Sequence, residues 1–97
     1  MKNITIIGRR WFDKINGNTY FSAEGLIDGE PKVKIDFSYG YGNQYEWETF
    51  GELEKQGYIT DVEHYKNGGH EAPFRYCQRK DITYYATVSD VNRKKDL

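Results

Sequence analysis

Two tight-turn dipeptides divide the N-terminal part of the chain into three segments with the character of β-strands. Asn16-Gly17 and Asp28-Gly29 are favoured in two-residue hairpins, because both central positions of such turns require a positive φ angle. The β-branched run Ile4-Thr5-Ile6-Ile7 lies before the first turn. We therefore expect a three-stranded antiparallel meander over about residues 3–39.

The third of these segments has the clearest strand pattern. Polar and apolar side chains alternate from residue 32 to residue 39, as in an antiparallel strand with one covered face. The apolar positions are Val33, Ile35, Phe37 and Tyr39. The pattern predicts that these side chains share the face that packs against the core.

Residues 45–56 have a helical pattern. The apolar residues that recur on one side are Trp47, Phe50 and Leu53. Asn43 is a suitable N-cap, and Glu46 three residues later completes the capping-box pattern. Gly57 is a typical residue for ending a helix, because glycine readily adopts the left-handed conformation after the cap. We expect this helix to lie across one face of the sheet, with Trp47 in the core.

The remaining segments complete the predicted fold. A second alternating pattern over residues 82–88 predicts a final strand, and residues 60–74 are expected to form a loop. Residues 92–97 are polar and are expected to fray. The predicted fold class is α+β: an antiparallel sheet of about four strands carries one main helix on one face. Residues 1–97 are expected to form a single domain.

The composition restricts the classes of partner. The formal net charge is −1, which argues against strong overall attraction to nucleic acid or to an anionic membrane. A single cysteine excludes an internal disulfide and is typical of a reducing compartment. The sequence shows no apolar run of membrane-spanning length and no signal-peptide pattern. We therefore expect a soluble cytoplasmic protein without membrane association.

The residues that most often carry catalysis do not form a known motif. His64, His70 and Cys77 are the candidates for a zinc site or a thiol nucleophile. Zinc requires three or four clustered ligands, and Cys77 has no recognisable base beside it. Glu48 and Glu52 lie one helical turn apart, a spacing that an acid–base pair shares with any solvated helix face. We therefore expect no catalytic residue, no metal and no cofactor, and we do not expect an enzyme.

The segment 37–47, FSYGYGNQYEW, is the best candidate for a contact surface. It places several aromatic residues on a connection containing Gly40 and Gly42, where aromatic area gives a domain no evident stability. Arginine and tyrosine are among the residues that dominate protein interfaces. The predicted partner-binding residues are Arg9, Arg10, Tyr39, Tyr41, Asn43, Gln44 and Tyr45. This hypothesis requires the tyrosines of the segment to be exposed to solvent.

Other ligands fit parts of the same pattern. The segment 40–42 and the start of the following helix offer backbone amides to an anion such as a nucleotide phosphate. Residues 8–12 combine arginines with aromatic rings, as single-stranded nucleic-acid binders do. Residues 46–63 are acidic and could imitate the phosphates of a nucleic acid. The sequence leaves these alternatives open.

Three short motifs resemble a family of short proteins encoded by tailed bacteriophages. The motifs are Gly8-Arg9-Arg10-Trp11-Phe12, Gly17-Asn18-Thr19-Tyr20 and Tyr39-Gly40-Tyr41-Gly42, and the resemblance covers about residues 4–45. The resemblance implies a small phage accessory protein and transfers no catalytic residue. Many such proteins bind and inhibit a bacterial defence component, including CRISPR effectors, and others sequester a nucleotide signal.

These observations together predict a non-catalytic phage accessory protein that acts in the host cytoplasm. It is expected to inhibit a host defence protein, in the manner of an anti-CRISPR protein, by occupying that protein's surface. The alternatives are a binder of a small nucleotide ligand and a structural or assembly protein of the virion. Pairing of two copies through an edge strand would make the protein a homodimer.

Overall fold

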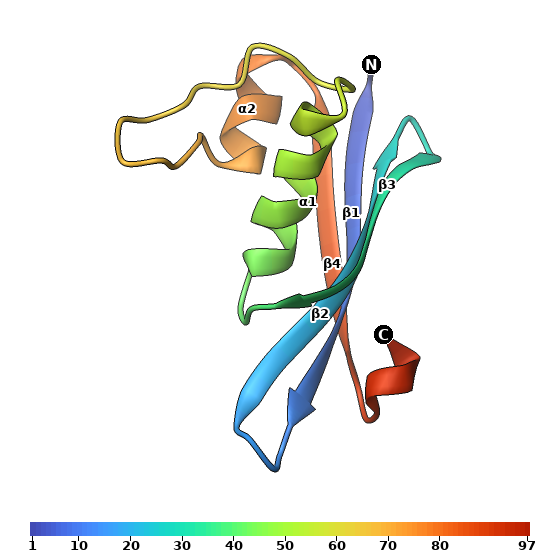
Figure 1. Ribbon diagram of the computed structural model, residues 1–97. Coiled ribbons are helices and arrows are strands. Elements are labelled where there is room, and N and C mark those ends of the chain that lie inside the picture. Colours follow the sequence, from blue (N-terminus) through green and yellow to red (C-terminus); the bar gives the residue numbers. More distant parts are fainter.

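Three consecutive antiparallel strands form the N-terminal part of the fold, as predicted. The structure is a computed structural model that describes residues 1–97 (Figure 1). The strands are β1 (Asn3–Asp13), β2 (Asn18–Ile27) and β3 (Glu30–Tyr39). Asp28 and Gly29 adopt positive φ angles of 50° and 83° and form the predicted two-residue turn. Asn16-Gly17 instead ends a longer loop over residues 14–17, in which only Gly17 has a positive φ angle.

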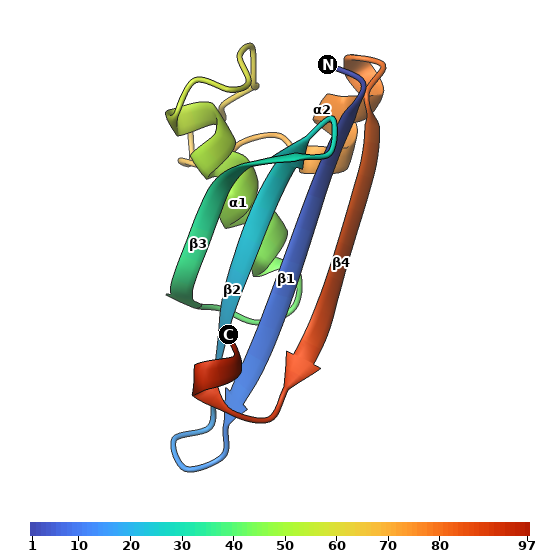
Figure 2. The ribbon, with the colours of Figure 1, turned by 90° about the vertical axis from the view of Figure 1, so that its right-hand side faces the viewer.

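The fourth strand runs in the opposite direction to the one predicted. β4 (Thr83–Val91) pairs with β1 in parallel, so the sheet is mixed and its strand order is β3-β2-β1-β4. The chain leaves β3, crosses one face of the sheet and returns to the end where β1 begins (Figures 1 and 2). A crossover connection of this kind makes adjacent strands parallel. The α+β class, with its meander and its main helix on one face, is confirmed.

Two helices cover one face of the sheet. α1 (Gln44–Lys55) corresponds to the predicted helix, and the shorter α2 (Pro73–Arg79) precedes β4. Trp47, which the prediction places in the core, is half-buried and packs on the ring of His70. The core between helices and sheet includes Ile4, Ile6, Phe21, Ala23, Val33, Phe50, Leu53 and Cys77.

The ends of α1 show which of the predicted capping contacts form. Asn43 occupies the N-cap position, but its side chain makes no capping hydrogen bond. Glu46 does not close a capping box; its carboxylate accepts a hydrogen bond from the Tyr84 hydroxyl at 2.6 Å. Gln56 caps the other end, and Gly57 follows it with a φ angle of 83°, as predicted. Glu46 therefore connects α1 to β4 instead of closing a capping box.

A register shift in the β2–β3 pairing divides the apolar side chains of β3 between the two faces of the sheet. Ile35 packs against the core, and Ser38 faces α1, where its hydroxyl donates to Glu48. The pairing shifts between residues 21 and 23 of β2, and Phe37 and Tyr39 lie on the opposite face. The prediction of one continuous apolar face on β3 is therefore wrong. Phe37 and Tyr39 belong to a cross-strand group, here called the aromatic row, which consists of Trp11, Tyr20, Phe37 and Tyr39.

The C-terminal residues lie over the face of the sheet that the helices leave open (Figure 2). A 3₁₀ turn, η1 (Lys94–Asp96), follows β4. The ammonium group of Lys94 lies 5.0 Å from the centre of the Phe37 ring, and Arg9 donates to the backbone carbonyl of Asp96. These contacts place residues 92–97 against the open face of the sheet.

Candidate functional site

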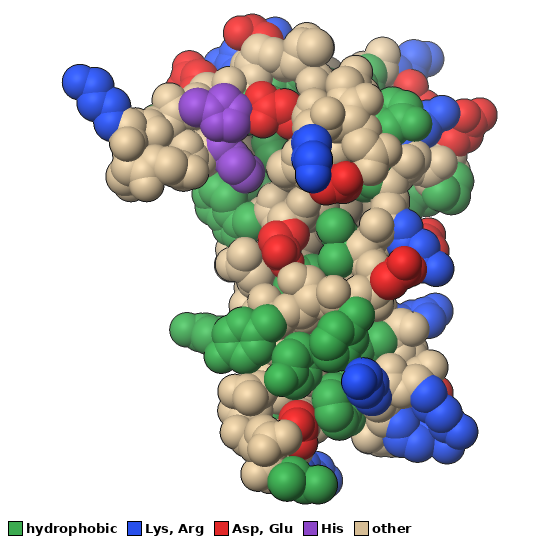
Figure 3. Space-filling model, in the orientation of Figure 1, with side chains coloured by type: hydrophobic (Ala, Val, Ile, Leu, Met, Phe, Trp, Pro, Cys, Tyr) green, Lys and Arg blue, Asp and Glu red, His purple; other side chains and the backbone are tan.

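A groove lies where the β1–β2 hairpin extends beyond the end of α1 and leaves part of the sheet uncovered (Figure 1). The groove has a volume of about 460 Å³ and lies between the ends of β1 and β4 and the β3–α1 connection. We call it the hairpin groove. Its lining includes Arg10, Phe12, Lys14, Tyr41, Asp90 and Val91. Apolar side chains gather at this end of the molecule, with basic side chains near them (Figure 3).

The conformation of the β3–α1 connection directs Tyr41 outward. Gly40 is buried, and a Cβ atom at this position would lie only 2.5 Å from Cγ of Gln44, so another residue would collide. Gly42 has a φ angle of 63°, which glycine adopts more readily than other residues. Gly40 thus allows close packing before Tyr41 and Gly42 allows the turn after it, and the Tyr41 side chain is 75% exposed.

Phe12 gives the hairpin groove a second exposed aromatic side chain. It is 52% exposed, because the end of β1 that carries it lies beyond α1 (Figure 1). Burying an aromatic ring stabilises a fold, and exposed rings gathered in one place are typical of contact surfaces. Phe12 was absent from the predicted set of partner-binding residues, as was Lys14. The two-residue spacing of Arg10, Phe12 and Lys14, at the end of β1 and the first residue of the following loop, is the sequence signal that places these side chains on one face.

The charged groups of the hairpin groove have different roles. Nε of Arg10 lies 3.2 Å from a carboxylate oxygen of Asp90, and Nη1 donates to the carbonyl oxygen of Gly42 at 3.3 Å. Arg10 therefore ties the β3–α1 connection to β1 and β4. Lys14 is exposed and forms no ion pair within the chain. The groove thus combines a braced guanidinium group, a free ammonium group and two exposed rings.

A smaller groove of about 390 Å³ adjoins the hairpin groove across Tyr41. Its lining is Tyr39, Gly40, Tyr41, Asn43 and Gln44. Tyr39 is 59% exposed, and Asn43 and Gln44 are also exposed. The structure therefore brings five of the predicted residues together around Tyr41: Arg10, Tyr39, Tyr41, Asn43 and Gln44.

Tyr45, a predicted partner-binding residue, belongs instead to the core. It is 5% exposed, and its ring packs so closely on Gly8 that a Cβ atom there would lie 2.6 Å from Cδ2 of Tyr45. Burial raises the pKa of the Tyr45 hydroxyl. The signal that identifies it is the spacing Tyr45, Thr49, Leu53, which places three buried residues on one stripe of α1.

Arg9 also lies apart from the hairpin groove. It faces the open side of the sheet, where it contacts the C-terminal segment and lines a groove with Ile7 and Leu97. The neighbouring aromatic row is formed by rings that stack on one another: the Tyr20 and Phe37 centres are 4.9 Å apart with an interplanar angle of 18°. Tyr20 thus stacks with Trp11 and with Phe37, whereas Tyr39 meets Tyr20 edge-on and remains exposed.

The surroundings of the cysteine and of the two histidines are those of residues with a structural role. Cys77 is fully buried, and burial raises the pKa of its thiol to about 11, so the thiol is protonated at neutral pH and is a poor nucleophile. His64 lies 2.8 Å from the Glu54 carboxylate, and His70 packs between α1 and the following loop. No group of three or more His, Cys, Asp or Glu side chains is placed to hold a metal ion.

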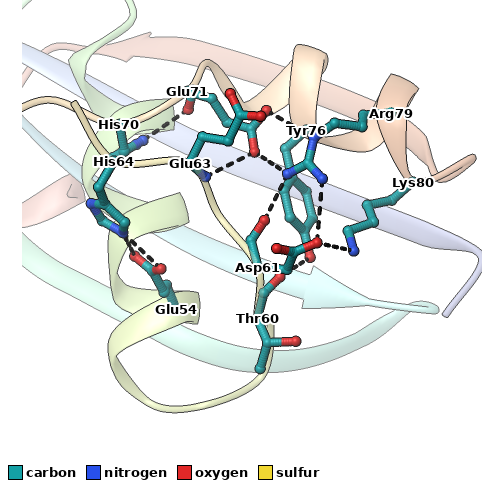
Figure 4. A network of polar contacts seen from close by, with 10 residues as sticks. All are labelled: Glu54, Thr60, Asp61, Glu63, His64, His70, Glu71, Tyr76, Arg79 and Lys80. Carbon is teal, nitrogen blue, oxygen red and sulfur yellow. Dashed lines mark hydrogen bonds and ion pairs between the residues drawn. The ribbon is translucent and has the colours of Figure 1, made fainter.

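A polar network fastens the loop after α1 to α2 (Figure 4). Glu71 is buried, and it pairs with Arg79 and accepts a hydrogen bond from the backbone amide of Glu63. Arg79 and Lys80 also contact Asp61. The hydrogen bonds from Arg79 to Glu71 and from Lys80 to Asp61 lower the pKa of each carboxyl group. These groups pair with one another, so the network clamps the loop after α1 to α2.

Comparison with known protein families, with curated proteins and with solved structures finds no match to this chain. Neither helix has the length and the hydrophobicity needed to cross a lipid bilayer.

Proposed function

We propose that this chain is a non-catalytic binding protein that contacts a partner protein through the hairpin groove and Tyr41. The observation that carries the proposal is the presence of two rings that are more than half exposed, Phe12 and Tyr41, beside Arg10 and Lys14 in one groove. Aromatic and arginine side chains are the residues that most often dominate the energy of protein interfaces. The smaller groove on the other side of Tyr41 includes Asn43 and Gln44, and their side chains add hydrogen-bonding groups at the edge of the contact surface.

The resemblance to short proteins of tailed bacteriophages suggests the biological setting. In this setting the chain is a phage accessory factor that binds a host defence component in the host cytoplasm and blocks the surface that the component needs. A CRISPR effector is one example of such a component. The uncovered sheet end and its exposed rings support a role in binding, and the identity of the partner rests on the resemblance alone.

Two substitutions in the groove test this proposal. The double variant Tyr41→Ala with Arg10→Ala should lose capture of a host protein that the wild type retains from bacterial lysate. Truncating a hot-spot residue typically lowers the binding free energy by about 2 kcal/mol or more, which is roughly a 30-fold loss of affinity. The affinity for the identified partner is then measured by calorimetry. Survival of binding in the double variant would show that the contact surface lies elsewhere.

A matched control separates a loss of contact from a loss of folding. Tyr58 and Arg75 are exposed residues outside both grooves of Tyr41. The variant Tyr58→Ala with Arg75→Ala removes the same two side-chain types and should retain full binding. Both double variants should keep the wild-type circular dichroism spectrum.

A small nucleotide is the second candidate ligand. Arg10 and Lys14 could contact phosphate while the Tyr41 ring packs on a base, and the groove volume of about 460 Å³ is within the range of small-molecule sites. A ligand that binds only the native state raises the melting temperature. Nucleotides should therefore raise the melting temperature of the wild type if this alternative holds, and leave it unchanged if the partner is a protein.

A further inference from the structure

The two edges of the sheet differ in their protection against pairing with another strand. Exposed edges of natural sheets are usually protected by charged residues, proline or β-bulges, which prevent another strand from adding. The β3 edge has all three devices. It contains Pro31, Lys32, Lys34 and Asp36, and its pairing with β2 has two register shifts.

The β4 edge has none of these devices over most of its length. Residues 83–89, TYYATVS, contain no charge and no proline, and they are rich in the β-branched and aromatic residues that favour strands. β4 pairs with β1 in an unbroken register from Thr83 to Val91. Apart from this ladder, the backbone of residues 84–91 makes no hydrogen bond within the chain. β4 is the outermost strand on its side of the sheet, and its outer edge faces solvent along most of its length (Figure 2).

We infer that this edge is an interface between two copies of the chain, in which β4 pairs with β4 antiparallel about a two-fold axis. A two-fold interface brings the same surface of each copy together, so a uniform uncharged edge is its own complement. The paired sheets form one continuous sheet across the two copies. The ladder supplies partners for the backbone N–H and C=O groups that the edge leaves in solvent.

The charges beside β4 indicate the register. With the two-fold axis at Thr87, Asp81 of one copy and Arg93 of the other come near each other just beyond the two ends of the β4–β4 ladder, and their charges are of opposite sign; Arg93 also pairs with Asp96 of its own chain at 3.1 Å. Asp81 forms no ion pair within its own chain. The same register sets Lys80 opposite Lys94. These two side chains are already engaged, Lys80 with Asp61 and Lys94 with the Phe37 ring.

The same register places Tyr85 of one copy opposite Ser89 of the other. Tyr85 is 60% exposed on the open face, and an adjacent strand would cover part of its ring. Cross-strand contacts of this kind stabilise a sheet by about 0.2–1 kcal/mol per pair. The pairing thus buries an exposed aromatic residue that the single chain leaves in water.

The first experiment measures the molar mass of the wild type by sedimentation velocity over a wide range of concentration. We expect a concentration-dependent doubling of the mass. The variant Thr87→Lys places two like charges opposite each other at the axis, and it should remain a monomer under the same conditions. The control Asp36→Lys adds the same side chain to the β3 edge and should still dimerise. A monomeric wild type at every concentration, or a dimer of unchanged affinity in Thr87→Lys, would overturn the inference.

A second experiment tests the register by disulfide formation. Cys77 is fully buried and should not react, so a cysteine introduced on the surface is the only reactive thiol. A mixture of Tyr85→Cys and Ser89→Cys should form a reducible mixed dimer under mild oxidation. The control Lys34→Cys on the β3 edge should form far less. Equal cross-linking of Lys34→Cys, or none between positions 85 and 89, would contradict β4–β4 pairing in this register.

Discussion

Replacing Phe50 by alanine is expected to lower the free energy of unfolding by about 3–5 kcal/mol. Phe50 is fully buried at the centre of α1. Its ring lies 5.3 Å from the Tyr76 ring of α2 at an interplanar angle of 69°, and 5.6 Å from the ring of His70. The substitution therefore leaves a cavity where α1, α2 and the loop between them meet. A loss of this size is a large fraction of the typical stability of a small domain, about 5–15 kcal/mol.

Urea unfolding of Phe50→Ala and Trp47→Ala, followed by circular dichroism, measures this effect. Trp47 is the matched control, because it is an aromatic residue of the same helix but is only half-buried. We expect Trp47→Ala to lower the free energy of unfolding by less than Phe50→Ala does, although the Trp47 side chain is larger. The reverse order would show that the packing described for α1 is incorrect.

The second large effect is expected at Gly8, where β1 meets Tyr45. A Cβ atom at this position would lie 2.6 Å from Cδ2 and 3.0 Å from Cγ of the Tyr45 ring, which is itself buried. Gly8→Ala should therefore destabilise the protein by about 1–3 kcal/mol, as overpacking of a core does. Tyr45 cannot move aside without displacing the first turn of α1.

Two comparisons distinguish this steric effect from a general response to alanine. Gly51 lies within α1, and a Cβ atom added there would lie 3.8 Å from Nε2 of His70, which is an ordinary contact. Gly51→Ala should therefore stabilise the protein by about 0.5–1 kcal/mol, since alanine favours helices. In a Tyr45→Leu background, Gly8→Ala should cost less than in the wild type, and purely additive free energies would contradict a contact between the two residues.

Local patterns in the sequence were sufficient to predict most of the helices and strands. They were insufficient to predict how these elements are arranged in the sheet. The Asp28-Gly29 turn and the α1 helix follow from turn chemistry and from a helical period, and both are confirmed. The direction of β4 depends on the crossover through the helices, which no local pattern specifies. The register shift beside Ser22 is equally invisible, because the alternation of β3 continues across it in the sequence.

The candidate site was predicted in part, for similar reasons. Glycines on both sides of Tyr41 indicated an exposed ring on a bent connection, and the structure places it in solvent. Tyr45 was misplaced because it follows the same connection in sequence but lies on the buried stripe of α1. Phe12 and Lys14 enter the site only because the β1–β2 hairpin is longer than the helix that covers it (Figure 1).

Site-specific photo-crosslinking tests most directly whether Tyr41 touches the partner. A photoreactive benzoylphenylalanine is placed at position 41 in one sample and at position 58, another exposed tyrosine, in a second. On irradiation in host lysate, we predict a covalent adduct with one host protein from position 41 and none from position 58. An adduct from position 58 and none from position 41 would contradict the assignment of the hairpin groove as the contact surface.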